Sequence, residues 1–326
     1  MKILLTTDVF PPGGGGSGQS TAALARALVR RGHEITVVVS KRNVSGELRR
    51  DWEGVAVIEI GVGRAKAGRS GRETRLARFI KDWAPEEKFD LAHAQHWLSA
   101  KATIDAFSTL NLPVVVTVRD YWPVCIWSTK LSGQHRCPGC SFVRRIVCVG
   151  RRRPVLWPLA PLLPVLVERE LTRRRKTLEK AAAVVAVSEH VKRSLPVDRA
   201  EVIPNLVDLS EIKKKLKGES FPELPDRFAL FVGKLEPNKA PDRLIPILQA
   251  SGVRLVLVIA GSGSLEGKLR KEATRFEGDV QFKGWVEADE TIRLMNRATA
   301  VLFPSRWDEP LSRVLLEGLG AGAVLL

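Results

Sequence analysis

The order of apolar segments is the feature that most restricts the fold of this chain. Short runs rich in β-branched residues recur and alternate with segments of helical periodicity, a pattern typical of a parallel sheet covered by helices. The predicted strands of the first half are residues 2–7, 34–39, 55–60, 89–94, 114–118 and 183–187, and helices 19–31 and 72–82 lie between some of them. These residues predict an α/β domain.

The alternation begins again in the second half. Strands 228–232, 253–260, 279–283 and 299–303 alternate there with helices 241–250, 265–275, 288–297 and 310–320. A lysine-rich stretch with Pro222 and Pro225 comes first and is typical of an interdomain linker. We predict two Rossmann-like domains facing a cleft, residues 1–205 and 206–326. The end, Gly320–Leu326, reads as the start of a buried strand, so we expect a truncated second domain.

The composition supports two cores and a basic surface. The chain has 326 residues, 44% of them hydrophobic, and a formal net charge of +16, which attracts phosphate-bearing partners. Basic residues cluster at Arg144, Arg145 and Arg151–Arg153, at Arg169 and Arg173–Lys176, and at Lys213–Lys215 and Lys217. The apolar segment 154–167 contains Trp157 and lies between two of these clusters. It suits the surface of an anionic membrane, or alternatively a buried element.

The termini and the hydropathy bear on localisation. Lys2–Asp8 reads as a strand rather than a signal peptide, and no apolar run reaches the length of a transmembrane helix. We expect a cytoplasmic protein, peripheral to the inner face of the cell membrane. A basic nucleic-acid-binding protein on the same scaffold is an alternative. It lacks a recognised binding module, so we expect no nucleic acid as partner.

All four cysteines fall in one short window, at Cys125, Cys137, Cys140 and Cys148. Cys137 and Cys140 form a C-x-x-C knuckle that can offer two thiolates to one metal, and the other two could complete a tetrahedral site. The spacing predicts a structural zinc, with an iron–sulfur centre or a reversible disulfide as alternatives. It is not a standard zinc-finger spacing.

Glu309 and Glu317 stand eight residues apart, after the predicted strand 299–303. Pro310 suits a first helical turn, and eight helical residues rise about 12 Å. That is the reach from a sugar ring, past a diphosphate, to a ribose, and a helix N-terminus between them would suit the diphosphate. The pair predicts a nucleotide-sugar site, and two surface glutamates on an amphipathic helix are the alternative.

Glycine-rich and lysine-bearing loops follow other predicted strands. Gly13–Gly18 opens a helix and matches G-x-G-x-x-G, but Phe10–Pro12 lengthens the turn and Ser40–Arg42 offers no carboxylate to a ribose. NADP, through Lys41 and Arg42, is therefore a remote alternative to a diphosphate bound by loop amides. Lys234 and Lys239 lie on a strand-to-helix loop of the second domain, where two ammonium groups can neutralise a leaving diphosphate.

Together these motifs resemble glycosyltransferase family 4, whose members have the two-domain GT-B fold. The likeness covers nearly all of the chain. It rests on Pro11–Gly16, Asp90–His93, Val187–Ser188, Val202–Asn205, Val232–Lys234 with Lys239, Ala260–Gly263, and Glu309 through Glu317. The cysteine segment, about residues 121–153, is similar to an insertion found in some bacterial members.

The resemblance implies transfer of a sugar from a nucleoside diphosphate donor, with retention at the anomeric carbon. By this likeness, Glu309 would contact the donor sugar and Glu317 the ribose. The diphosphate would be held by Lys234 and Lys239, beside Gly233, and across the cleft by amides near Gly15 and Gly16. No D-x-D motif occurs, so no cofactor is expected to be required for donor binding.

The chain departs from the family pattern near the acceptor. Arg119 and Asp120 stand where a His–Asp pair is usual, so Arg119 is expected to grip an acceptor phosphate. His93, at another strand end, is the candidate for a direct catalytic role. In the donor domain, Lys234 replaces the usual arginine and Ala240 replaces the glycine that usually follows Lys239.

We therefore expect a retaining glycosyltransferase with a saccharide or lipid-linked acceptor, acting in the synthesis of a cell-surface polysaccharide or glycolipid. A non-catalytic fragment remains an alternative. The sugar, the nucleotide base and the acceptor are left open.

Overall fold

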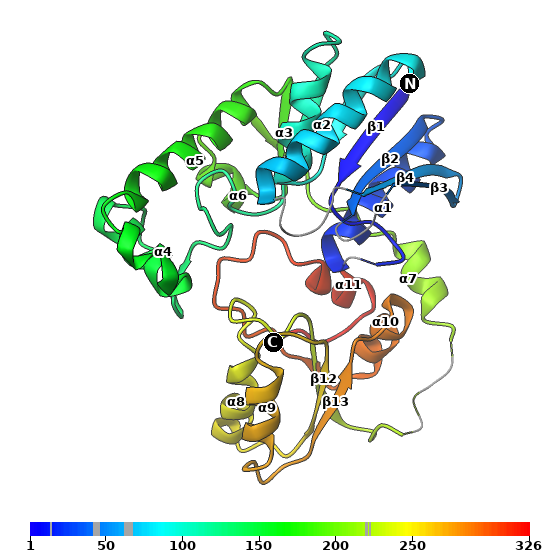
Figure 1. Ribbon diagram of the computed structural model, residues 1–326. Helices are drawn as coiled ribbons and strands as arrows, with labels where there is room; N and C mark the ends of the chain where they lie inside the picture. Colours follow the sequence, from blue (N-terminus) through cyan, green and yellow to red (C-terminus); the bar gives the residue numbers. More distant parts are fainter. Residues whose placement is uncertain (14, 42–45, 62–67, 219–220, 222) are drawn as a thin grey trace. The chain divides into compact units, whose positions relative to one another are not determined.

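The computed structural model describes residues 1–13, 15–41, 46–61, 68–218, 221 and 223–326. The chain forms two compact units (Figure 1): unit 1 comprises Met1–Thr129 and Gly139–Leu206, and unit 2 comprises Lys130–Pro138 and Val207–Leu326. The main boundary falls after residue 206, one residue from the predicted position. Gly14, Arg42 and Pro222, which the sequence interpretation used, lie outside the described residues.

Unit 1 is built on an eight-stranded sheet with the order β10-β9-β6-β5-β1-β2-β4-β3. Its strands are β1 (Lys2–Thr7), β2 (Glu34–Lys41), β3 (Glu47–Trp52), β4 (Val55–Gly61), β5 (Leu91–Ala94), β6 (Val114–Val118), β9 (Ala183–Ala186) and β10 (Ala200–Val202). All pairings are parallel except that of β3 with β4. The six predicted strands are present. Sequence reading missed β3 because it carries charges at the sheet edge instead of an apolar run.

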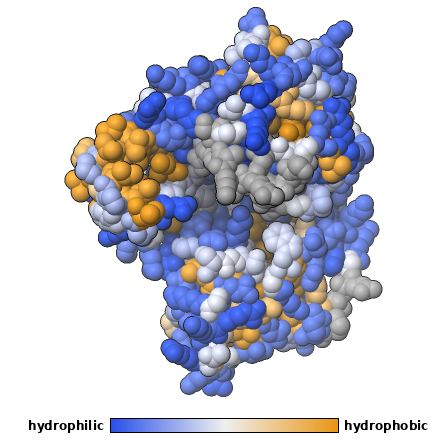
Figure 2. Space-filling model, in the orientation of Figure 1, coloured by the Kyte–Doolittle hydropathy of each residue, from blue (hydrophilic) through white to orange (hydrophobic). Residues whose placement is uncertain are grey.

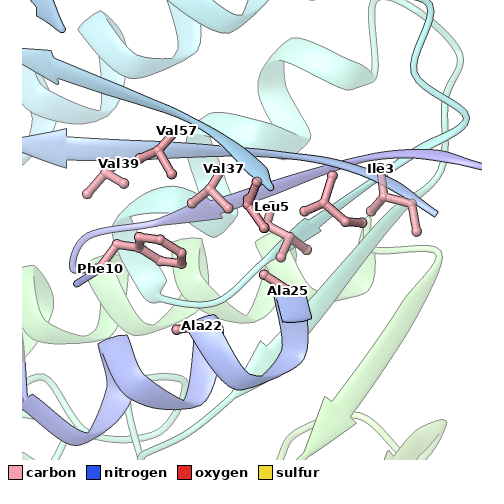
Figure 3. Packing of buried hydrophobic residues seen from close by; sticks show 10 residues of the cluster. Ile3, Leu5, Phe10, Ala22, Ala25, Val37, Val39 and Val57 are labelled. Carbon is pink, nitrogen blue, oxygen red and sulfur yellow. The ribbon is translucent and has the colours of Figure 1, made fainter. Parts of the chain in front are cut away.

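Helices cover this sheet, and α1 shows how they pack. The helices of unit 1 are α1 (Gly15–Arg30), α2 (Gly68–Glu87), α3 (Trp97–Phe107), α4 (Phe142–Arg152), α5 (Leu163–Glu179) and α6 (Glu189–Ser194), with the 3₁₀ helix η2 (Pro154–Leu159). Ala22 and Ala25 of α1 face Leu5 and Val37 of the sheet (Figure 3), and all four side chains are fully buried. Small residues on the helix let it approach the sheet closely, which orients the N-terminus of α1 at the carboxyl end of β1.

Unit 2 contains a four-stranded parallel sheet with the order β13-β12-β11-β14. Its strands are β11 (Phe228–Val232), β12 (Val256–Ala260), β13 (Val280–Gly284) and β14 (Ala300–Val301). The predicted strand at the chain end forms as a parallel bridge between Val301 and Leu325. A separate hairpin, β7 (Leu131–Ser132) with β8 (His135–Arg136), also belongs to unit 2, which the sequence did not predict.

The predicted linker contains a helix that packs into unit 2. The helices of this unit are α7 (Leu209–Lys215), α8 (Leu244–Ser251), α9 (Glu266–Ala273), α10 (Ala288–Arg297) and α11 (Arg313–Gly320), with the 3₁₀ helix η3 (Pro241–Arg243). Asp208 caps α7 by accepting hydrogen bonds from the amides of Ser210 and Glu211. Ile212 is buried against Ile292. The linker prediction was therefore wrong over residues 209–215.

Within the part of the chain that the structure describes, no helix is both long and apolar enough to cross a membrane.

Candidate functional site

The carboxyl ends of β11 and β12 carry two loops that pack backbone to backbone. A Cβ atom on Gly261 would lie 1.9 Å from the carbonyl oxygen of Gly233, and Gly261 has a φ of +147°. The Leu235 amide donates to the carbonyl of Ser262 at 2.9 Å. Only glycine fits this crossing, and it forms at the edge of a parallel sheet where ligands of α/β proteins bind.

Lys239 and Glu309, both predicted site residues, form an ion pair in unit 2. Their side chains are 22% and 15% exposed. The second carboxylate oxygen of Glu309 accepts hydrogen bonds from the Ser305 hydroxyl, at 3.0 Å, and from the Trp307 indole N–H. The Lys239 ammonium lies 5.6 Å from the ring centroids of both Phe303 and Trp307. Glu309 is thus held by three donors from two loops.

A second ion pair, which the sequence analysis missed, joins the same two loops. Arg306 donates to both oxygens of Asp242, at 2.7 and 2.9 Å, and its amide donates to the Asn238 carbonyl at 3.0 Å. Burial raises the pKa of the Asp242 carboxyl, but the hydrogen bonds and charge of Arg306, with the charge of Lys268, hold that pKa below its ordinary value. The residues lie 64 positions apart, so no local pattern could reveal them.

The helix after Glu309 begins later than predicted. Ser312 is the N-cap and α11 starts at Arg313, so Pro310 and Glu309 lie outside the helix. The bonds to Ser305 and Trp307 keep Glu309 in the preceding loop, so a helical rise cannot describe its separation from Glu317. Glu317 lies in α11 and accepts a hydrogen bond from Arg313 at 2.6 Å.

The remaining predicted donor residues lie on the β11 loop or the α1 terminus. Lys234 follows Gly233 and is exposed. Its ammonium group is therefore accessible to a ligand. In unit 1, Gly15 is the first residue of α1 and has a φ of +58°, and the neighbouring Gly16 is exposed. Amides at a helix N-terminus can bind an anion.

His93 lies in β5 and is paired within the sheet. Its Nε2 atom lies 2.7 Å from the Thr117 hydroxyl of β6. Burial, and secondarily the charge of Arg119, lowers the pKa of His93 to about 3. A general base works best with a pKa near the working pH, so this geometry favours a structural role for His93 over the predicted catalytic one.

His96, three residues on, contacts the end of β1 and the residue that follows it, through Thr7 and Asp8. It is the N-cap of α3, and its Nδ1 atom lies 3.0 Å from the Thr7 hydroxyl at the end of β1. Burial is the main cause that lowers the pKa of His96; Asp8 opposes the shift and Arg119 adds to it.

Arg119 and Asp120 follow β6 and have different surroundings. Arg119 donates to the side-chain oxygens of Asn205 and Gln95, and both of these partners are neutral amides. Asp120 accepts a hydrogen bond from the Trp122 amide at 2.7 Å, which stabilises the turn after the strand. An acceptor phosphate at Arg119 stays a prediction.

The four cysteines lie within the described residues, and none of them forms a disulfide: Cys125, Cys137, Cys140 and Cys148. Among the described residues, which include all four, no group of three or more His, Cys, Asp or Glu side chains is arranged to hold a metal ion. The zinc hypothesis gains no support from this arrangement.

Two protein families together cover almost the whole sequence. Residues 14–211 match the family described as Glycosyltransferase Family 4, and residues 212–326 match Glycosyl transferases group 1. The chain belongs to glycosyltransferase family 4. Its enzyme class is therefore that of the glycosyltransferases, as the resemblance implied.

The curated proteins to which this chain is similar are distant in sequence. YtcC of Bacillus subtilis (strain 168) is 28% identical over 180 residues, which span 47% of this chain and only 44% of YtcC. The "Uncharacterized glycosyltransferase MJ1607" of Methanocaldococcus jannaschii is 23% identical over 350 residues, covering 99% of this chain and 79% of that protein. A 42.6 kDa protein in the cps region of Klebsiella pneumoniae is 21% identical, with coverages of 99% and 84%.

Solved structures confirm the GT-B fold. Sucrose-phosphate synthase from Thermosynechococcus elongatus superposes with a TM-score of 0.72 at 16% identity, covering 99% of this chain and 80% of that one. HepE of Anabaena, in complex with UDP-glucose, gives a TM-score of 0.64 at 16% identity, with coverages of 100% and 79%. At these identities the likeness establishes the fold alone.

Proposed function

We propose that this chain transfers a sugar from a nucleoside diphosphate sugar to a saccharide or lipid-linked acceptor, with retention at the anomeric carbon. The observation that carries the proposal is the Lys239–Glu309 pair, held on two strand-end loops of unit 2 beside the Gly233–Gly261 crossing. At this sheet edge the chain presents a cation and a carboxylate that are already in place. A donor with a diphosphate and sugar hydroxyls suits such a pair of groups.

The charges divide naturally between the parts of such a donor. The ammonium groups of Lys239 and Lys234 would stabilise the negative charge that develops on the leaving diphosphate. The Glu309 carboxylate would accept hydrogen bonds from sugar hydroxyls, and Glu317 would do so from the ribose. Amides at Gly15 and Gly16 would offer a further anion site. Donor binding in this proposal requires no metal.

The ligands of the structural neighbours guide our choice of the nucleoside diphosphate in the donor. HepE was solved with UDP-glucose, and the neighbour described as "Trehalose-6-phosphate from E. coli" was solved with UDP-2-fluoro glucose. Starch Synthase IV from Arabidopsis thaliana was solved with ADP. A uridine diphosphate sugar is our first choice of donor, and an adenosine diphosphate sugar is the second.

The acceptor side of the proposal rests on Arg119. Arg119 donates to the side-chain oxygens of Asn205 and Gln95, and its guanidinium has the planar, permanently charged geometry that suits an anionic group such as an acceptor phosphate. We place the enzyme on the cytoplasmic, inner face of the cell membrane, in the synthesis of a cell-surface polysaccharide or glycolipid. The Klebsiella relative from a cps region is consistent with this pathway.

The deciding experiment is donor turnover on a panel of UDP-, GDP- and ADP-sugars, followed by release of the free nucleoside diphosphate. We expect release from one nucleotide class. Lys239→Ala and Glu309→Ala should each lower kcat by about 100-fold or more, the size expected when a preorganised charge is removed. Glu317→Gln should mainly raise the KM for the donor.

Lys271→Ala is a matched control, since Lys271 is an exposed lysine of α9 in the same unit. It should change kcat less than about twofold. No release from any donor by a protein that unfolds cooperatively would favour a non-catalytic role. Equal losses in Lys271→Ala and Lys239→Ala would contradict the assigned site.

A further inference from the structure

Unit 1 exposes a row of large apolar side chains on α4, η2 and the start of α5. The exposed fractions are 81% for Val155, 47% for Trp157, 56% for Leu162 and 62% for Val165, and Phe142, Val143, Leu159 and Leu166 are exposed as well. Figure 2 shows a hydrophobic area at the left of the view, in the region where Figure 1 places α4 and the beginning of α5. We call these eight residues the apolar ridge.

The side chains of the apolar ridge are not part of the hydrophobic core beneath α4 and α5. The inner faces of α4 and α5 have their own buried cluster, formed by Val149, Leu163, Val167 and Leu171. The Trp157 ring lies against Gly150 of α4, where a Cβ atom would come within 2.7 Å of it. The ridge is therefore a fixed outer face of a packed element, and exposed apolar area of this kind marks an interaction surface.

Cations surround the ridge. Arg144, Arg151 and Arg153 are exposed on or after α4, and Arg169, Lys176 and Lys180 are exposed on or just after α5. Within the described part of the chain none of these six forms an ion pair with a carboxylate. Their charge is thus available to a partner.

The cations of α5 share one helical face with the ridge. At 100° per residue, Leu162, Val165, Arg169, Lys176 and Lys180 lie within about 60° of one another around the helix axis. This face borders a groove of about 740 Å³, lined on its apolar part by Phe142, Pro164 and Val165. Arg169, Lys176 and Lys180 line its basic part, and the carboxylates of the lining, Asp105 and Glu168, form ion pairs with Lys101 and Arg145. One surface therefore offers apolar insertion and anion binding together.

We propose that this face docks on a membrane rich in anionic phospholipids. The apolar ridge would enter the boundary between headgroups and acyl chains, and the cations of the groove would bind the lipid phosphates. A helix face of this composition is what an interfacial element requires. The inference concerns a surface separate from the donor site, and it does not depend on the proposed transfer reaction.

A protein partner fits this surface less well than a lipid one. The core of a protein interface is depleted in charge, and six uncompensated cations would need a matching set of carboxylates. An anionic bilayer presents negative charge over its whole surface, so the cations need no partner groups at matching positions. Trp157, half exposed at the junction of ridge and cations, also has the amphipathic ring that favours the headgroup level.

The test is flotation of the full chain with vesicles of phosphatidylcholine alone or with 30 mol% phosphatidylglycerol. We expect binding only to the anionic vesicles, weakened by added salt. The triple variant Arg169→Gln/Lys176→Gln/Lys180→Gln should lower the partition coefficient by about 100-fold, since each cation near the surface contributes about a factor of five. Val155→Ser/Leu162→Ser/Val165→Ser should also lower it at equal charge.

Lys213→Gln/Lys214→Gln/Lys217→Gln is the matched control, because it also removes three positive charges, but from exposed positions of unit 2. It should retain binding to within about threefold if α5 makes the contact. Absence of flotation with anionic vesicles at low salt would overturn the proposal, as would equal losses in the control and the α5 variant.

A stable dimer that the serine variant dissociates, without vesicle binding, would instead assign the ridge to a second copy of the chain. Donor turnover without vesicles should be unchanged in all three variants, which separates this outcome from a failure of the proposed function.

Discussion

Lys239 and Glu309 are 70 residues apart in sequence, and their side chains form a partly buried ion pair. The Lys239 loop follows β11, and the Glu309 loop follows β14. Because β11 and β14 are adjacent parallel strands, their carboxyl ends bring the two loops to one edge of the sheet. The pair therefore combines a structural contact with a candidate binding role.

Coupling between these two residues should be measurable in stability. We expect Lys239→Met and Glu309→Gln to lower the free energy of unfolding by about 2 kcal/mol each, and the double variant to lose clearly less than the sum. Urea unfolding checks this. The exposed pair Glu266–Arg270 of α9, with side chains 31% and 54% exposed, is the control and should couple by about 0.5 kcal/mol or less. Additive losses for Lys239 and Glu309 would contradict the contact.

Gly261 should tolerate no side chain. In Gly261→Ala the new methyl group would meet the Gly233 carbonyl oxygen at 1.9 Å and the backbone would be strained, so we expect a loss of about 3 kcal/mol or more. Gly267→Ala is the matched change, since that glycine lies in α9 with open space at its Cβ position. It should raise stability by about 0.5–1 kcal/mol. Thermal unfolding distinguishes the two, and similar melting temperatures would disprove the close crossing.

Ala240 occupies a strained backbone position. It is fully buried with a φ of +52°, and Pro241 follows it. Left-handed geometry costs an alanine about 1–2 kcal/mol, and a following proline restricts it further. Loss of one buried methyl group costs about 0.8 kcal/mol, so Ala240→Gly should leave stability unchanged or slightly raised.

Ala229→Gly in β11 supplies the comparison, because Ala229 is equally buried in an ordinary strand. Denaturant unfolding should show a loss of about 1 kcal/mol or more for that variant. A larger loss in Ala240→Gly than in Ala229→Gly would show that the alanine at 240 is unstrained.

Acidification should destabilise unit 1 through His93. Its pKa is about 3 in the folded chain, against 6.5 as the ordinary value, so the unfolded chain binds more protons between these pH values. Stability is therefore present above pH 6.5 and is lost as the pH falls toward 3, with a slope of up to about 1.4 kcal/mol per pH unit. The pKa of His96 is also lowered, so this residue contributes to the pH dependence with the same sign.

His93→Asn should flatten that slope, as measured by denaturant unfolding at several pH values. The amide can still hydrogen-bond to Thr117 but does not titrate. His33, half-buried just before β2 at the other end of the sheet, gives the control variant His33→Asn, which should leave the slope unchanged. An unaltered slope in His93→Asn would mean that another group controls acid stability. Donor turnover reduced less than tenfold in this variant would favour the structural role.

The candidate site shows which predictions a sequence can support. Strand-end position and spacing predicted Glu309, Glu317, Lys234 and Lys239 as site residues, and the structure pairs two of them, Lys239 and Glu309. The start of α11 at Arg313 was not, because side-chain bonds to Glu309 from Ser305 and Trp307 hold the preceding loop out of the helix. The Arg306–Asp242 pair also escaped detection, since nothing local connects it.

Two fold elements show the same limit. The lysine-rich segment 209–215 has too few apolar residues to indicate a core helix, yet Asp208 caps it and Ile212 anchors it against α10. β3 has no apolar run, and it exists because the edge of β4 offers backbone partners. In both cases a tertiary contact outweighs weak local preference.

The sequence by itself determined the α/β class, the two units and the strand ends at which the site residues lie. It could do so because apolar periodicity and turn residues act locally along the chain. Only the tertiary structure decided which carboxylate pairs with Lys239, that His93 contacts Thr117 of the neighbouring strand, and that the apolar ridge and the cations share one surface. Those facts depend on pairing, burial and charge between residues distant in sequence, which no local pattern encodes.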